Sequence, residues 1–259
     1  MKTLTIARNM VKETIRRSSF QVMLIFSFLL LAGLGILARL LSSGATDVAG
    51  EKVLMFTHFD LGIRVISLFG VLITVLTTMA AIPTEIERRT TYTIFSRPIR
   101  RYEFVLGKYL GVLFVIALNL AVMAIVAFVV FADQHENLAY ILRDIAMLGY
   151  SLAALAALTI FFSTFMSAIP SGVLGFSIYE LGKQPGWVHK IWEAQNLNIV
   201  LRITAKGIYH IIPRVNWLNY EAPIIEISRH EQAMGMQYVG IYIVVLLIIA
   251  SLIFGRKEL

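Results

Sequence analysis

The chain has 259 residues, of which 58% are hydrophobic and 15% are charged, and its net charge is +7. Such an apolar composition would leave large hydrophobic patches in water, so it excludes an ordinary soluble domain and predicts an all-helical integral membrane protein. About six spans of roughly 20 residues would use nearly the whole length, so no soluble catalytic domain is expected. Because the sequence contains no cysteine, disulfides and thiolate metal sites are excluded as well.

The first segment, residues 3–18, is predicted to form an amphipathic helix that lies in the plane of the membrane. Its apolar residues recur at spacings of three and four, whereas Arg8, Lys12 and Arg16 fall on another face. The alternative is a simple basic tail beside the first span. The charges extend too far for a signal peptide, and no small-residue cleavage site follows, so the first apolar run is expected to remain as an anchor.

Six apolar runs are predicted to be transmembrane helices. They occupy residues 19–40, 62–83, 109–132, 145–166, 168–183 and 237–254. The fifth run is short and follows the fourth almost directly, which predicts a tight helical hairpin with Pro170 in a first turn that needs no backbone donor. An even number of spans places both termini on one side, together with 13 of the 23 basic residues. Both termini are therefore predicted to be cytoplasmic.

Between the second and third runs, residues 84–108 form the densest cluster of charge, on one aqueous side of the membrane. Thr90 or Thr91 can cap a short helix, and Pro98 disfavours helical geometry at the residue before it, so this helix is predicted to end near Ser96. An apolar centre with a charged rim is typical of a docking surface, and a solvated basic loop that binds anionic headgroups is the alternative. The candidate docking residues are Glu85, Glu87, Arg88, Thr90, Thr91, Tyr92, Ile94, Phe95, Arg97, Pro98, Arg100 and Arg101.

The segment between the last two runs, residues 184–236, is predicted to lie on the outer side. Residues 196–212 are apolar enough for a further span, but Arg202, Lys206 and His210 recur at spacings of four and would form a charged stripe. This pattern favours an amphipathic helix on the outer surface. Tryptophans and tyrosines around it predict an interfacial belt, which we favour over a ligand-binding aromatic box.

Two stretches carry a resemblance to a known family. Glu87–Gly111 reads ERRTTYTIFSRPIRRYEFVLGKYLG and resembles the first cytoplasmic loop of permease subunits in the type-2 ABC exporter family. Within that family it is most similar to the branch that includes the permease of the copper-maturation transporter of nitrous-oxide reductase. Tyr209–Asn219, YHIIPRVNWLN, is similar to the external stretch before the last span of these permeases. Many relatives have Gly-Thr where Thr90 and Thr91 stand here, which affects the start of the predicted helix.

The resemblance implies a single permease domain, residues 1–259, in the cell inner membrane, with residues 84–108 as a coupling loop. It also implies a second permease, which is either another copy of this chain or a close homologue, and two copies of a separate ABC ATPase that binds ATP and magnesium. Accessory envelope proteins are further possible partners, and no nucleic acid is expected to bind. The chain itself has no phosphate-binding loop, because Tyr109 follows Gly107-Lys108 where a hydroxyl residue would bind magnesium. No enzyme activity or cofactor is therefore expected in this chain. The substrate cannot be read from the sequence.

Two other functions are alternatives to an ABC permease. A membrane anchor that recruits an ATPase for envelope maturation or signalling would use the same docking loop. A transporter driven by an ion gradient predicts a carboxylate at the membrane midplane, and the predicted spans place none there.

A few further side chains are candidates for chemistry. Glu180 and Arg64 lie near the outer ends of spans and are candidates for the mouth of a path, with snorkelling to the interface as the alternative. His230, Met234 and Met236 precede the last span and offer imidazole and thioether ligands that suit copper. Methionine as a flexible core filler is the preferred interpretation.

Overall fold

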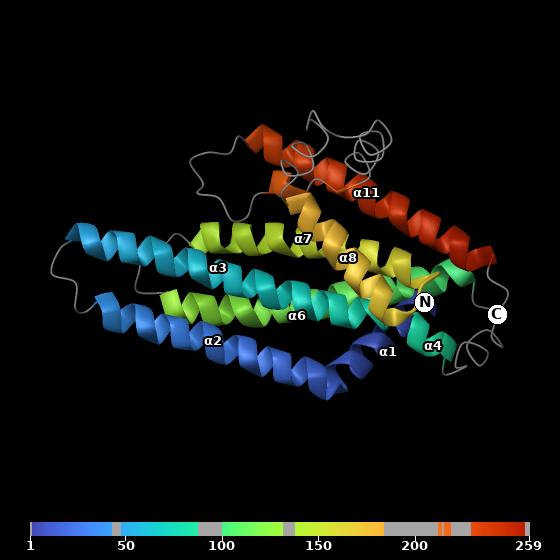
Figure 1. The fold of residues 1–259 in the computed structure, drawn as a ribbon, viewed down its shortest axis with the longest axis horizontal. Coiled ribbons are helices and arrows are strands. Elements are labelled where there is room, and N and C mark those ends of the chain that lie inside the picture. The colour runs from blue at the N-terminus through green and yellow to red at the C-terminus, as the bar shows by residue number, and fades with distance from the viewer. Residues whose placement is uncertain are drawn as a thin grey trace, which may run out of the picture.

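In the computed structural model, every regular element of the described part of the chain is helical. The described residues are 2–42, 48–87, 100–131, 138–183, 212–213, 215–218 and 229–256. The long helices are α2 (Ser18–Ser42), α3 (Val48–Met79), α6 (Arg101–Phe131), α7 (Leu138–Ser163), α8 (Ala168–Lys183) and α11 (Arg229–Arg256). Most of them run broadly along the long axis of the molecule, whereas α8 lies obliquely against α7 and α3 (Figure 1). The prediction of an all-helical membrane protein is therefore confirmed in its class.

Five of the described helices are long and apolar enough to cross a membrane. The qualifying stretches are Ser18–Leu37, Leu61–Ile86, Arg101–Val129, Leu142–Ser163 and Gln232–Arg256. The remaining long helix, α8, has 16 residues. At 1.5 Å per residue it is about 24 Å long, which is less than the roughly 30 Å of bilayer hydrocarbon. The structure therefore supports five spans by length and composition, and the six-span layout stays a prediction.

Several helices begin before the apolar runs that predicted them. α6 begins at Arg101 and not at residue 109, so residues 101–108 of the predicted loop are helical. Its start is fixed locally, because the Arg100 backbone N–H donates to Glu103 Oε2 over 2.9 Å, as in one half of a capping box. α11 likewise begins at Arg229, inside the predicted outer segment. The rest of that segment, including residues 196–211, lies outside the described residues except for 212–213 and η2 (Val215–Leu218).

The core forms where α7 is enclosed by α3, α6, α8 and α11. All ten residues from 151 to 160 of α7 are buried, as expected for a helix that is apolar on every side. Small residues allow its neighbours to come close: a Cβ on Gly175 of α8 would lie only 2.4 Å from Thr159 Oγ1. The hydroxyls of Ser151 and Tyr179 form a 2.7 Å hydrogen bond between the same two helices. The predicted α7–α8 hairpin is confirmed, with Pro170 in the first turn of α8.

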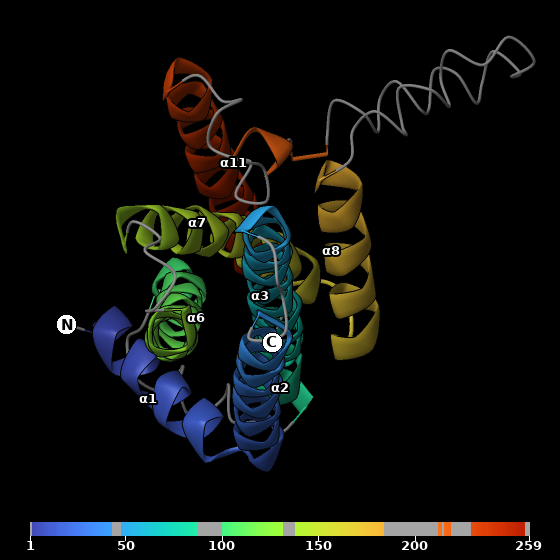
Figure 2. The ribbon, with the colours of Figure 1, turned by 90° about the vertical axis from the view of Figure 1, so that its left-hand side faces the viewer.

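The N-terminal segment forms a helix, α1 (Lys2–Arg16), close to the predicted bounds. Viewed along the bundle, α1 lies crosswise below α6 and reaches toward α2 (Figure 2). Two glycines of α6 permit this contact. A Cβ on Gly107 would lie 2.8 Å from the Ile6 Cβ, and one on Gly111 would lie 3.0 Å from the Ala7 carbonyl oxygen. The two glycines are four residues apart, the spacing that lets helix backbones approach in membranes.

The face that α1 turns toward the bundle differs in part from its predicted apolar face. Ala7, Met10 and Thr14 are buried, whereas Leu4 is 73% exposed and Ile15 is 36% exposed. The apolar stripe is therefore divided between the protein and the outer surface. Whether that surface lies in the membrane plane stays a prediction.

Candidate functional site at the junction of α4, α6 and α11

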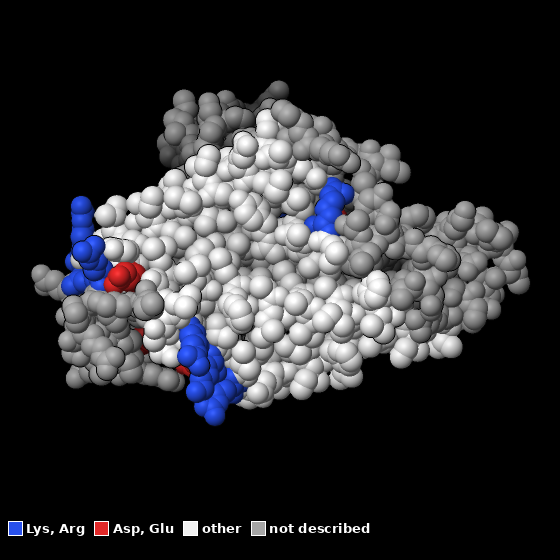
Figure 3. Space-filling model, turned by 180° about the vertical axis from the view of Figure 1, so that it is seen from behind, with Lys and Arg blue, Asp and Glu red and all other residues white. Residues whose placement is uncertain are grey.

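The candidate site lies at the end of the bundle that carries both termini (Figure 1). Here α1, the short helix α4 (Pro83–Glu87), the first turns of α6 and the last turn of α11 come together. In a view from behind, Lys and Arg gather at this end, a further patch lies about midway along the molecule, and the described surface between them shows no charged side chain (Figure 3). A charge-free band of this kind is what a bilayer requires of the surface that it covers.

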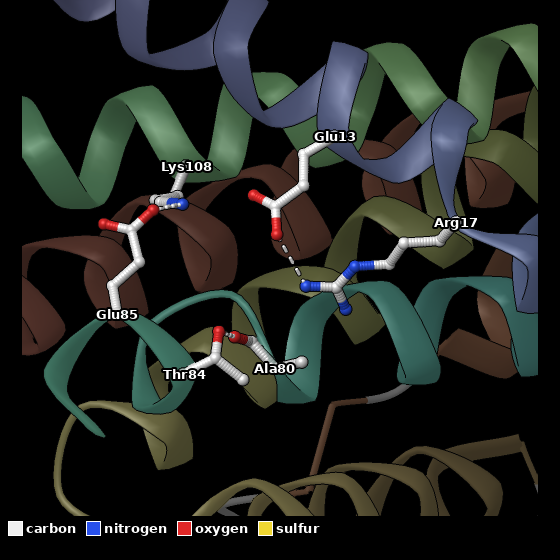
Figure 4. A network of polar contacts seen from close by, with 6 residues as sticks. All are labelled: Glu13, Arg17, Ala80, Thr84, Glu85 and Lys108. Carbon is white, nitrogen blue, oxygen red and sulfur yellow. Dashed lines mark hydrogen bonds and ion pairs between the residues drawn. The ribbon is translucent and has the colours of Figure 1, made fainter. Parts of the chain in front are cut away.

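The centre of the junction is an ion pair between α4 and α6. The Lys108 ammonium donates to Glu85 Oε1, and Figure 4 shows the two side chains meeting between the helices. Lys108 is only 4% exposed, and its ammonium also lies 5.7 Å from the centroid of the Phe104 ring. The Thr84 hydroxyl donates to the Ala80 carbonyl and joins α4 to the end of α3. A buried charge needs such a partner, so the pair ties α4 to α6.

A second link joins the start of α6 to the end of α11. Arg101 Nη1 donates to the carbonyl oxygens of Phe254 at 3.3 Å and Gly255 at 2.8 Å. These carbonyls are in the last turn of a helix, where no intrahelical donor remains and a positive charge is favourable. The rings of Phe104 and Phe254 stack with centroids 5.5 Å apart and planes at 15°. Residues about 150 positions apart in the sequence are thus joined at one point.

The two neighbouring arginines of the predicted docking set have different environments. Arg100 is exposed and donates to the Tyr102 hydroxyl over 3.2 Å, and this hydrogen bond raises the pKa of the Arg100 guanidinium. Arg101 instead points into the fold toward α11. In the contacts described above, Arg101 is therefore bound to another helix, α11, whereas Arg100 is bound to a residue two positions away.

Two of the predicted docking residues lie at this junction. Glu85 contacts Lys108 of α6, and Arg101 is the first residue of the same helix. Glu87 is the last residue of α4. Arg100 is described as well, and eight members of the set lie outside the described residues, namely Arg88, Thr90, Thr91, Tyr92, Ile94, Phe95, Arg97 and Pro98. The short helix predicted to end near Ser96 lies there as well, so its docking role stays a prediction.

The sequence prediction included Glu85 and Arg101 but missed the residues that they contact in the junction. Lys108 was counted only as a basic residue of a loop, and Phe254 only as part of an apolar span. The spacing of Gly107 and Gly111 was a usable signal, because it is the pattern of two helices in close contact. No local pattern pairs Lys108 with Glu85, since the two are 23 residues apart.

The residues proposed for other sites stand apart from the junction. Glu180 forms an ion pair of 3.3 Å with Lys183 on its own helix, and Arg64 is exposed on α3. Met234 and Met236 are 46% and 37% exposed on α11, and the His230 side chain lies outside the described part. In the side chains that the structure does describe, no three His, Cys, Asp or Glu residues form a metal-binding group. A path mouth at Glu180 and Arg64 stays a prediction.

Comparison with known proteins covers almost the entire chain. A family model described as "ABC-2 family transporter protein" matches residues 4–259. No curated protein matches the chain significantly. The match does not extend to the narrower branch that contains the permease of the nitrous-oxide-reductase copper-maturation transporter.

Proposed function

We propose, since the chain belongs to the ABC-2 family of transporter proteins, that it couples ATP hydrolysis in a separate ATPase to the movement of a substrate across the membrane. In this role it is the permease subunit and carries no catalytic residue of its own. The expected assembly contains two permease copies and two ATPase copies, and ATP and magnesium are bound by the ATPase. The resemblance of Glu87–Gly111 is what supports membership of the branch named above as part of this proposal, and the substrate stays unassigned.

The observation that carries this proposal is the anchoring of both ends of residues 88–99. On one side, α4 is held to α6 by the ion pair of Glu85 with Lys108. On the other side, the first residue of α6 is held to α11 by the hydrogen bonds of Arg101. A force applied to residues 88–99 would therefore be passed to α4, α6 and α11 through these contacts. Coupling between sites needs such packed, discrete contacts.

The ATPase contact is tested by placing charge on the apolar residues of the predicted docking helix. Replacing Ile94 and Phe95 with Asp buries unpaired charge at the contact, so the ATPase should no longer co-purify with the permease. Asn9→Asp is the matched control, because Asn9 is exposed on α1 at the same end of the bundle. Co-purification of the ATPase at wild-type yield with the double variant would show that this segment is not the dock.

The orientation follows from the distribution of basic residues, and we propose that both termini face the cytoplasm from the inner membrane. A cysteine introduced at Gly186 or Glu231 should react with an impermeant thiol reagent in intact cells, and one at Thr91 should not. The native chain has no cysteine, so the background is low. Labelling at Thr91 would reverse the orientation.

A further inference from the structure

A long apolar groove runs between α6 and α11 at the end of the bundle that carries the termini. Its volume is about 510 Å³, which is within the range of ligand pockets. The walls are apolar, with Leu106 from α6 and Val244, Ile248 and Leu252 from α11. Val244, Ile248 and Leu252 are each more than half exposed. A groove of this composition in a membrane protein is filled by acyl chains or by another protein surface.

The length of the groove matches one leaflet of a bilayer. It extends along α11 from Val244 to Gly255, which at 1.5 Å per residue is roughly 16 Å. One half of the hydrocarbon core is about 15 Å thick. The groove is open at its Gly255 end, because no heavy atom apart from the adjoining backbone of α11 lies within 4 Å of the position that a Cβ on Gly255 would take. A groove of this length would reach from the headgroup level to about the middle of a bilayer.

Positive charge is concentrated at the open end. Arg101 lines the groove, and its hydrogen bonds to the Phe254 and Gly255 carbonyls hold its guanidinium there. Arg100 and Arg256 are exposed at the ends of the same two helices. Glu103 is the acidic residue beside them, and its carboxylate accepts the Arg100 backbone N–H. The three arginines and the one glutamate described at this end give a net charge of about +2.

The aromatic residue at the open end is also typical of the headgroup level. Tyr102 lines the groove, is 44% exposed, and its hydroxyl accepts a hydrogen bond from Arg100. Tyrosine favours this level because its ring is apolar and its hydroxyl is polar. The apolar length and the basic end thus complement the two parts of one kind of lipid.

We propose that this groove binds one acyl chain of an anionic phospholipid and that Arg100, Arg101 and Arg256 bind its phosphate headgroup. The charge at the open end decides for an anionic lipid over a neutral one, since each basic residue near an anionic surface favours binding by about 1 kcal/mol, or about fivefold. The lipid would lie against the link between α6 and α11. Its binding is independent of the ATPase and of the transported substrate.

The test uses a tryptophan reporter in the groove. Leu252→Trp protein is reconstituted in phosphatidylcholine vesicles that contain brominated phosphatidylglycerol or, separately, brominated phosphatidylcholine, which quench tryptophan. The matched control is Gly33→Trp, because Gly33 lies on α2, away from the groove, and has open space around its Cβ position. The signal of the three native tryptophans is subtracted. We expect phosphatidylglycerol to bind at least about fivefold more tightly than phosphatidylcholine at position 252 and equally at position 33.

Two further variants separate the charge from the groove. Arg100→Gln with Arg256→Gln should bring the preference at position 252 close to one, and Gly255→Phe should reduce binding of both lipids by filling the open end. Unmodified protein provides a readout that needs no variant: after delipidation, native mass spectrometry should find phosphatidylglycerol retained over phosphatidylcholine.

Three outcomes would overturn the proposal. The first is equal binding of the two lipids at position 252. The second is no quenching by either lipid together with cross-linking between two copies through a cysteine at 252, which would make the groove an interface between protomers. The third is equal retention of the two lipids by the unmodified protein.

Discussion

Removing one partner of the ion pair between Glu85 and Lys108 should destabilise the protein more than removing both. Breaking a buried pair typically costs about 3–5 kcal/mol, because the remaining charge is left without compensation. In Glu85→Leu the remaining charge is Lys108, which is 4% exposed, while the Phe104 ring at 5.7 Å offsets about 1–2 kcal/mol. The expected loss in the free energy of unfolding is therefore about 2–3 kcal/mol.

The opposite single change should cost less. Lys108→Met leaves the Glu85 carboxylate, whose side chain is 19% exposed and so lies closer to water. We expect a loss of about 1–2 kcal/mol. The double variant Glu85→Leu with Lys108→Met leaves no charge and should lose less than about 1 kcal/mol, since a buried pair and an apolar pair of similar volume are often equally stable. The coupling free energy would then be at least about 2 kcal/mol.

The measurement is unfolding of the purified permease by sodium dodecyl sulfate in mixed micelles, followed by circular dichroism, for the wild type and the three variants. Additive losses, with the double variant as unstable as the sum of the single ones, would refute the reasoning. They would mean that the two side chains do not depend on one another, and that α4 is held to α6 by other contacts.

Three further predictions use the same measurement. Gly107→Val should lower stability by about 1–3 kcal/mol, because the larger side chain forces α1 away from α6. The control Gly33→Val has open space at its Cβ position and should change stability by less than about 0.5 kcal/mol. Equal effects of the two changes would contradict the close contact. Arg101→Ala should lower stability by about 1–2 kcal/mol and should also lower substrate stimulation of the ATPase. Arg100 is exposed, so Arg100→Ala should change stability by no more than about 0.5 kcal/mol. A larger effect for Arg100 would reverse the roles of the two arginines. Asn119 is 1% exposed, and neither polar atom of its side chain has a hydrogen-bond partner among the described residues. Asn119→Leu should therefore raise stability by about 1–3 kcal/mol. A loss of stability would reveal a bound partner for the amide.

The sequence alone determined the class of the protein and the location of its long helices. Hydrophobic runs, the proline at the start of α8 and the short connection before it are local features, and local features suffice where a bilayer permits only helices. The family was also readable, because the resemblance of Glu87–Gly111 agrees with a family match over residues 4–259.

Tertiary structure alone decided which charges pair between helices. Lys108 and Glu85 are 23 positions apart, and Arg101 and Phe254 are 153 apart, so no local pattern joins them. The apolar run predicted that the third span begins at residue 109, but α6 begins at Arg101, where Glu103 caps its first turn, and the side chains of Arg101 and Lys108 then bind α11 and α4. The division of α1 into a buried and an exposed face was decided in the same way, because the glycines that admit its backbone lie on α6, more than ninety residues further along the chain.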